Sequence, residues 1–246
     1  EEEASVFYAE QVSSTSLSNA DVEEILKDAV EADKVGFRAK GLFQRGESEP
    51  FSGWIKAMYN PKQVRMIESF KDGKRDGLEM RWYENGQKQS EQNWKVGTRD
   101  GPSNHWFKSG QKQSAGTLKD GKTVGLYTSW HENGTKSSEV TNDKYGRIVG
   151  VMTSWYTNGQ KSSEATFKQD KQEGLAMKWH ENGQKSREET YKDGKRDGLR
   201  TRWHENGQKD SEAIYRNGRK IGLETTWHEN GQKKSEITWK AIEKDT

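Results

Sequence analysis

The sequence predicts a mostly β protein, an elongated antiparallel β-meander of about eight 24-residue hairpin repeats with a short N-terminal helical cap. Three observations predict this fold. Large aromatic residues and glycines recur every 24 residues, Asn-Gly and Asp-Gly turn signals separate them, and one segment with helical spacing precedes the first repeat. The expected organisation is an N-terminal segment at 1–36, a repeat domain at 37–240 and a tail at 241–246.

Tryptophan and glycine mark the repeat. The tryptophans of the repeat are Trp82, Trp106, Trp130, Trp155, Trp179, Trp203 and Trp227. They lie 24 residues apart except for one interval of 25, and the additional residue falls within 140–146. Glycines keep the same interval from Gly53 to Gly222, and a second bulky side chain follows each tryptophan position by twelve residues, except in the irregular repeat around Asn142. Glycine recurs too often for helices, so each repeat predicts one β-hairpin.

Two hairpin registers are compatible with the recurring "WHENGQK" string. A two-residue Asn-Gly loop places Trp203 and Leu199 on one face with Glu212 and Ile214. A three-residue Glu-Asn-Gly loop pairs His204 with Gln208 and gathers the apolar side chains on the tryptophan face. A one-residue slip moves every side chain to the other face. We favour the three-residue loop, because it separates apolar residues from charged ones.

The composition limits the core and the partners. The residues AVILMFWYC make up only 28% of the chain, yet it has 10 tryptophans, so the expected core is thin and built on the seven repeat tryptophans. The 41 basic and 39 acidic residues nearly balance, which argues against nucleic-acid binding. No apolar run approaches the ~18 residues of a membrane span. There is no cysteine, so disulfides and thiolate metal sites are excluded.

The stretches "DGLEMRWYENGQKQSE" and "GLRTRWHENGQKDSEAIYRNGRK" resemble the bacterial variant of the MORN repeat, typified by YwqK-family antitoxin-like proteins. The resemblance covers roughly residues 50–240, and it departs from the pattern at "GPSNHWFKSGQKQSAGTL" and at 140–146. The resemblance implies a meander of hairpins and says little about activity. It also implies protein scaffolding or contact with membrane lipids, as for MORN repeats elsewhere.

Residues 18–34 have the spacing of an amphipathic helix. Val22, Ile25, Leu26 and Ala29 fall on one face, and Ser18 with Asp21 resembles a capping box. We expect a helix over about 19–33 that caps the exposed edge of the first hairpin, as end caps do in repeat proteins. The alternative is a helix that docks on a partner.

The recurring histidines and carboxylates do not form a catalytic or metal-binding pattern. Like positions in neighbouring hairpins lie ~10 Å apart, whereas two nitrogens on one zinc ion lie within ~4 Å. The repeated glutamates share one environment, while an acid–base pair needs two different ones. We therefore predict no catalytic residues, no metal, no cofactor and no enzyme activity.

The remaining prediction is a scaffold that binds another protein along its sheet. A row of rings beside the tryptophans is the predicted protein-binding ribbon: Tyr83, Phe107, His131, Tyr156, His180, His204 and His228. The partner is a different protein, in an antitoxin-like role or otherwise, or identical chains joined through sheet edges as a homo-oligomer or filament. A lipid-head-group binder is a second alternative, disfavoured because no polybasic cluster is evident. The start "EEEASVFYAE" leads us to expect an exported protein, periplasmic or extracellular, rather than a cytoplasmic one.

Overall fold

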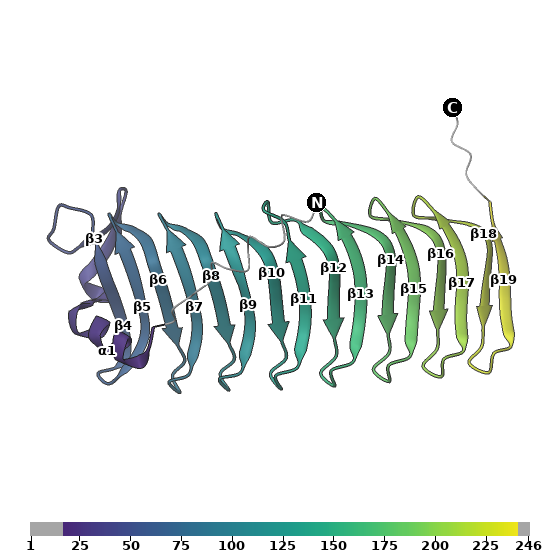
Figure 1. Cartoon of the computed structure of the whole chain (residues 1–246), viewed down its shortest axis with the longest axis horizontal. Coiled ribbons are helices and arrows are strands. Elements are labelled where there is room, and N and C mark those ends of the chain that lie inside the picture. Colours follow the sequence, from purple (N-terminus) through teal and green to yellow (C-terminus); the bar gives the residue numbers. More distant parts are fainter. Residues whose placement is uncertain (1–16, 241–246) are drawn as a thin grey trace, which may run out of the picture. The chain divides into compact units, whose positions relative to one another are not determined.

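A computed structural model of the 246-residue chain describes residues 17–240. The chain divides into two compact units, with the boundary between Thr123 and Val124. In each unit, successive antiparallel strands are joined by hairpins, and the single α-helix of the described residues lies near the start of the chain (Figure 1). The predicted β-meander of hairpin repeats with a short N-terminal helix is therefore confirmed. The predicted tail at 241–246 lies outside the described residues.

Unit 1 contains the cap and three hairpins. The cap elements are α1 (Asn19–Asp28), β1 (Val30–Glu31), the 3₁₀ helix η1 (Ala32–Lys34), β2 (Val35–Arg38) and β3 (Gly41–Gln44). The hairpin strands are β4 (Gly53–Asn60), β5 (Gln63–Lys71), β6 (Lys74–Trp82), β7 (Lys88–Lys95), β8 (Thr98–Trp106) and β9 (Lys112–Lys119).

Unit 2 contains five hairpins. Its strands are β10 (Lys122–Trp130, in unit 2 from Val124), β11 (Lys136–Asn142), β12 (Ile148–Trp155), β13 (Lys161–Lys168), β14 (Lys171–Trp179), β15 (Lys185–Lys192), β16 (Lys195–Trp203), β17 (Lys209–Arg216), β18 (Arg219–Trp227) and β19 (Lys233–Trp239). Each strand pairs antiparallel with the next one along the chain, as in a simple meander.

The two kinds of turn differ, as their sequences require. In the "ENGQ" turn the amide of His204 donates to the Gln208 carbonyl at 2.9 Å, and that of Gly207 donates to the His204 carbonyl at 3.0 Å. This is the predicted three-residue loop. In the Asp-Gly turn, Asp193 and Gly194 both have positive φ, at 51° and 78°, which suits a two-residue turn. The additional residue of the sequence lies in the turn after β11, where Asp143 and Arg147 close a longer loop.

A bulge beyond the predicted loop reverses the predicted faces. Trp203 pairs with Lys209, but Arg202 pairs with Ser211, so Asp210 is the bulged residue. Beyond it, Leu199 pairs with Ile214. Residues directly opposite each other share a face, so Leu199 and Ile214 lie on the face we call outer. Arg200 and Ala213 pair on the other face, which we call inner. The face assignment from the three-residue loop was therefore wrong.

Residues of the cap pack against both faces of the first hairpin. On the outer side, Val22 of α1 clusters with Ile67 of β5 and Met80 of β6. On the inner side, Val35 and Leu42 of β2 and β3 cluster with Ile55, Met66 and Phe70. At the edge, β1 pairs in parallel with β4. The helix begins at the capping box of Ser18 and Asp21, as expected, but it ends at Asp28 because Ala29 turns extended and leads into β1.

The seven repeat tryptophans are not the core. All of them are half-buried, and none is among the fully buried apolar residues. Unit 1 has two apolar clusters around its cap, whereas the buried residues of unit 2 are mostly polar, such as Glu189, Arg200 and Thr225. The prediction of a tryptophan core is wrong because the bulge places the rings on the outer face, where no second layer covers them among the described residues of unit 2.

Candidate interaction surface

The rings predicted as a protein-binding ribbon connect each repeat to the next one. The Tyr156 hydroxyl donates to the Trp179 carbonyl at 2.7 Å, and His180 Nε2 lies 3.0 Å from the Trp203 carbonyl. Since a carbonyl only accepts, that nitrogen carries the hydrogen. The same contact is made by Tyr59, Tyr83, His131 and His204.

Phe107 and His228 complete the row without this bond. Phe107 has no polar ring atom, and His228 is exposed in the last hairpin. The other five rings of the predicted ribbon are half-buried, and each bonds a backbone carbonyl of the next repeat through one polar ring atom. This ring position therefore has a structural role in joining neighbouring repeats, which the sequence analysis missed.

Tyr156→Phe tests this structural role. The variant removes one hydroxyl that donates to a backbone carbonyl, so we expect a loss of about 1 kcal/mol in the free energy of unfolding. A denaturant titration measures it. Tyr127→Phe is the matched control, because the Tyr127 hydroxyl makes no hydrogen bond with the described residues. Equal losses in the two variants would contradict the role of the ring as a connector.

The asparagine of the turn makes a second connection. In Asn182, the side-chain oxygen accepts from the Gln184 amide at 3.0 Å, and Nδ2 donates to the Glu205 carbonyl at 2.8 Å. The same pair of bonds is made by Asn85, Asn133, Asn158 and Asn206. The string Trp-His-Glu-Asn-Gly recurs because each copy supplies both the donors and the acceptors that join neighbouring hairpins.

Lysines cover the tryptophan rings on the outer face. Lys185 Nζ lies 5.9 Å from the centre of the Trp203 ring and 2.6 Å from Glu188 Oε2. The same arrangement links Lys209 to Trp227 and to Glu212. Cation–π contacts at partly exposed sites contribute about 0.5–1 kcal/mol each. These lysine charges are already neutralised, so this part of the outer face is not an open charged site.

The inner face of unit 2 carries a buried charge network. Glu189 is buried and accepts from Arg196 Nε at 2.7 Å and from the Tyr191 hydroxyl at 2.9 Å. Burial raises the pKa of Glu189, but these hydrogen bonds and the Arg196 and Arg187 charges outweigh it, so the pKa is lowered overall. The carboxylate stays charged and structural.

A hollow of about 300 Å³ lies on the inner face of unit 1 beside Trp94 and His105. Arg75 and Arg99 stack against Trp94, with guanidinium carbons 4.9 and 5.3 Å from a ring centre. Burial, followed by the Arg99 charge, lowers the pKa of His105. His105 Nε2 lies 2.9 Å from the side-chain amide of Gln92. Trp94 Nε1 donates to Glu79 at 2.8 Å, whereas the buried side-chain oxygen of Gln92 has no hydrogen-bond partner among the described residues.

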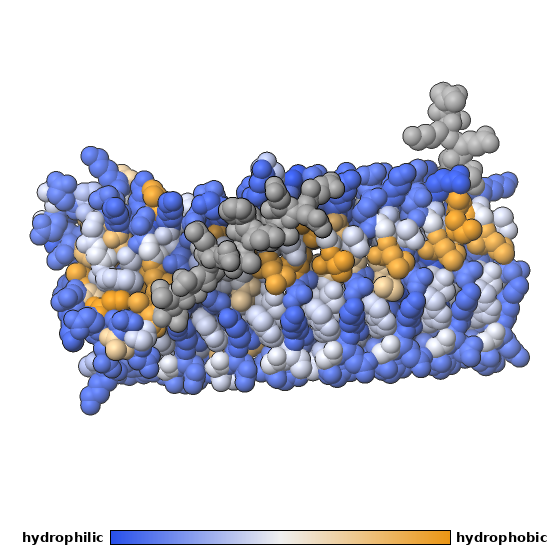
Figure 2. All heavy atoms as spheres, viewed as in Figure 1, coloured by the Kyte–Doolittle hydropathy of each residue, from blue (hydrophilic) through white to orange (hydrophobic). Residues whose placement is uncertain are grey.

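One row of apolar residues is exposed along the outer face of unit 2. The apolar row consists of Leu126, Val151, Leu175, Leu199 and Leu223, one from each hairpin. Each side chain is between 46% and 55% exposed. Figure 2 shows apolar groups gathered along one level of these strands, with hydrophilic groups on either side. Contiguous exposed apolar surface on a folded protein marks an interaction site.

A row of exposed cations lies beside the apolar row, at the two-residue turns that follow β13, β15 and β17. The basic row consists of Lys168, Lys171, Lys192, Lys195, Arg216 and Arg219. Its members face each other in like-charged cross-strand pairs, such as Lys192 with Lys195 and Arg216 with Arg219. Strand alternation puts Arg216 on the same face as Ile214. None of the six makes an ion pair with another described residue, and like charges directly opposite are destabilising.

The sequence analysis missed both rows. The residue after the repeat glycine, such as Leu199, was placed on a buried face, and the "KDGK" lysines were interpreted only as turn residues. The pairs of like charges that flank these turns were the available signal of the basic row. Such pairs destabilise a hairpin, so the stability of the fold does not explain why they recur.

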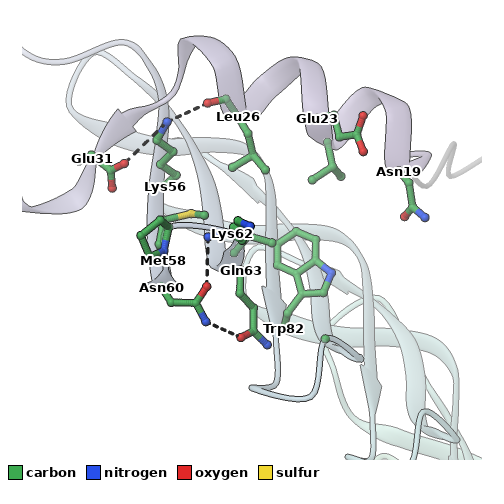
Figure 3. Close-up of a pocket in the computed structure, with 14 residues that line it drawn as sticks. Asn19, Glu23, Leu26, Glu31, Lys56, Met58, Asn60, Lys62, Gln63 and Trp82 are labelled. Atoms are coloured by element: carbon green, nitrogen blue, oxygen red, sulfur yellow. Dashed lines mark hydrogen bonds and ion pairs between the residues drawn. The ribbon is translucent and has the colours of Figure 1, made fainter.

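A groove of about 980 Å³ separates α1 from the end of the first hairpin (Figure 3). Leu26 of α1 and Trp82 of β6 face it, and Lys56 donates to the Leu26 carbonyl at 2.8 Å beside Glu31. Asn60 fixes the hairpin turn below by accepting from the Lys62 amide at 3.1 Å. The groove lies at the margin of the packing contact between α1 and the outer face.

Within 17–240, no helix is long and apolar enough to cross a membrane. Across the same stretch, no group of three or more histidine, cysteine or carboxylate side chains is placed to hold a metal ion.

Comparison with known families identifies the repeats. The family model described as the MORN repeat variant matches residues 75–95, 148–169, 172–193, 196–217 and 220–241. The region between the first and second match includes both stretches that depart from the repeat pattern. No curated protein matches the sequence.

Proposed function

We propose that this chain, in which five segments match the MORN repeat variant, is a non-enzymatic scaffold that binds another protein along the outer face of unit 2. One observation carries the proposal: the apolar row lies exposed in every hairpin of this unit. Repeat proteins bind partners along such continuous surfaces. An antitoxin-like role is the case in which the partner is a toxin.

Site-specific crosslinking tests this function. A photoreactive amino acid replaces Leu199 in the full chain, which is illuminated in its native cells. We expect a covalent adduct with a second protein. The control position is Tyr145, which is equally exposed at 56% but lies in a turn outside the row. Equal adducts at both positions, or none at Leu199, would refute the proposal.

Self-assembly through sheet edges is a second candidate, favoured by β19. This last described strand pairs with β18, and its Ile237 and Trp239 are 50% and 41% exposed. The edge of β4, however, pairs with β1 at Ile55 and Lys56. A head-to-tail filament needs both edges open, so the cap favours the scaffold over the filament.

A further inference from the structure

We infer that the apolar row and the basic row of unit 2 together bind an amphipathic α-helix of a partner protein, with acidic residues along one flank of that helix. This inference rests on the proposed function and names the form of the partner. It draws on the way in which unit 1 covers the same face, on the spacing of the row and on its charges.

In unit 1, the helix α1 covers part of the outer face. Leu78 holds the same repeat position as Leu199, and Met80 holds that of Thr201. The apolar face of α1 packs here: Val22 joins Ile67 and Met80 in one cluster, with Leu78 and Trp82 against it. Ile67 and Met80 are left 0% and 1% exposed. An amphipathic helix is therefore the element that this repeat surface accepts.

The apolar part of the outer face is narrower in unit 2 than in unit 1. A helix that binds it must therefore have a narrower apolar stripe than α1. Ile67 corresponds in the repeat to Glu188, which forms an ion pair with Lys185. The tryptophans of this face lie under lysines, so the residue at the Leu199 position is the one that is both apolar and exposed in every hairpin of unit 2. The fitting helix has a narrow apolar stripe and polar residues on both sides of it.

The spacing of the row matches a helix that crosses the strands. Equivalent positions in neighbouring hairpins are two strands apart, which is about 9.6 Å. Residues i and i+7 of a helix are about 10.5 Å apart and lie on nearly the same side. One apolar residue in every seven can therefore meet Leu175, Leu199 and Leu223 in turn.

The basic row selects the charge of the helix. Arg216 and Arg219, like the lysine pairs of the neighbouring turns, have no acidic partner among the described residues, whereas Lys185 and Lys209 on the opposite side of the row are paired with glutamates. A helix along the row thus meets unpaired positive charge on one flank only. Asp or Glu on that flank relieves the repulsion between the paired cations.

The probe is a labelled 21-residue helical peptide with leucine at every seventh position, glutamate along one side of that leucine stripe and neutral polar residues elsewhere. Its stripe and its charge have the spacing and the sign that the apolar row and the basic row require. The native α1 of the full chain stays on Ile67 and Met80, so binding reports a second surface. Fluorescence anisotropy is expected to show saturable binding to the full chain that weakens as salt is added.

Two variants identify the surface. The triple variant Leu175→Thr, Leu199→Thr and Leu223→Thr should weaken peptide binding at least ~10-fold, because it removes the apolar stripe and keeps β-compatible side chains. The double variant Arg216→Glu and Arg219→Glu should weaken it and reduce its salt dependence. Tyr145→Ser is the control and should leave binding unchanged. A scrambled peptide of the same composition should not bind.

Other occupants give different results. Binding of the chain to anionic phospholipid vesicles, lost in the triple variant while the peptide does not bind, would overturn the inference in favour of a membrane surface. A dimer in sedimentation velocity that the triple variant dissociates would assign the row to a second copy. If the peptide does not bind while Leu199 still crosslinks to a protein, the scaffold stands and the helix is refuted.

Discussion

Ile67→Ala is expected to lower the free energy of unfolding of unit 1 by about 3 kcal/mol. Ile67 is 0% exposed between β5 and α1, where it contacts a cluster that includes Val22 and Met80. Truncation leaves a cavity that neither the strand nor the helix can fill without moving, and such changes cost roughly 2–5 kcal/mol. A denaturant titration followed by tryptophan fluorescence measures the loss.

The matched control is the same substitution on the same face of unit 2. Ile214 is 44% exposed, so Ile214→Ala removes little buried surface and should cost less than about 1 kcal/mol. Hydrogen exchange adds a second readout, because amides of α1 should lose protection in Ile67→Ala and keep it in Ile214→Ala. Equal losses of stability would show that α1 does not cover the outer face.

The repeat and its turns were predictable because they depend on local chemistry. Positive φ at Gly207 and Gly194 favours glycine whatever the rest of the sheet does. The N-terminal cap was predictable for the same reason, since Ser18 and Asp21 form their capping box within one turn of helix. The exact end of that helix was not, because Ala29 leaves the helix to let β1 pair with β4.

The faces of the hairpins were not predicted, because a bulge depends on contacts across the strand. In a regular strand, residues three apart point to opposite faces. The bulge at Asp210 puts Lys209 and Glu212 on one face, where they form an ion pair at 2.6 Å. The repeated Lys-x-x-Glu spacing after every "ENGQ" turn was the signal for this bulge. Without it, apolar and charged residues were sorted by polarity, and the exposed apolar row was assigned to the core.

The interior glycines follow from a second bulge. Gly101 lies within β8, with φ of 118°, where Gln92 pairs with Ser103 and Trp94 with Arg99. A Cβ on Gly101 would come 2.9 Å from the Cβ of Asn93. The sequence showed the period of these glycines but not their cause, because the bulge requires both strands.

Glu189→Gln is expected to cost about 3 kcal/mol at pH 7, the second large effect. Glu189 is 4% exposed and accepts hydrogen bonds from Arg196 and Tyr191. The amide cannot neutralise Arg196, and bonds to charged groups contribute roughly 1.5–3 kcal/mol each. Its neighbour Glu188 is the control: it lies on the outer face, where its side chain is 36% exposed beside Lys185. Glu188→Gln should cost less than about 1 kcal/mol.

The pH dependence of Glu189→Gln follows from the direction of the pKa shift. Burial raises the pKa of Glu189, but Arg196 and Tyr191 outweigh it, so the folded pKa lies below the unfolded one. The stabilisation is therefore fully present above the unfolded pKa and is lost as pH falls through the folded pKa. Urea titrations from pH 7 into the acid range should show the wild-type and Glu189→Gln stabilities converging as pH falls. A constant difference would mean that Glu189 stabilises unit 2 through its shape and not through its charge.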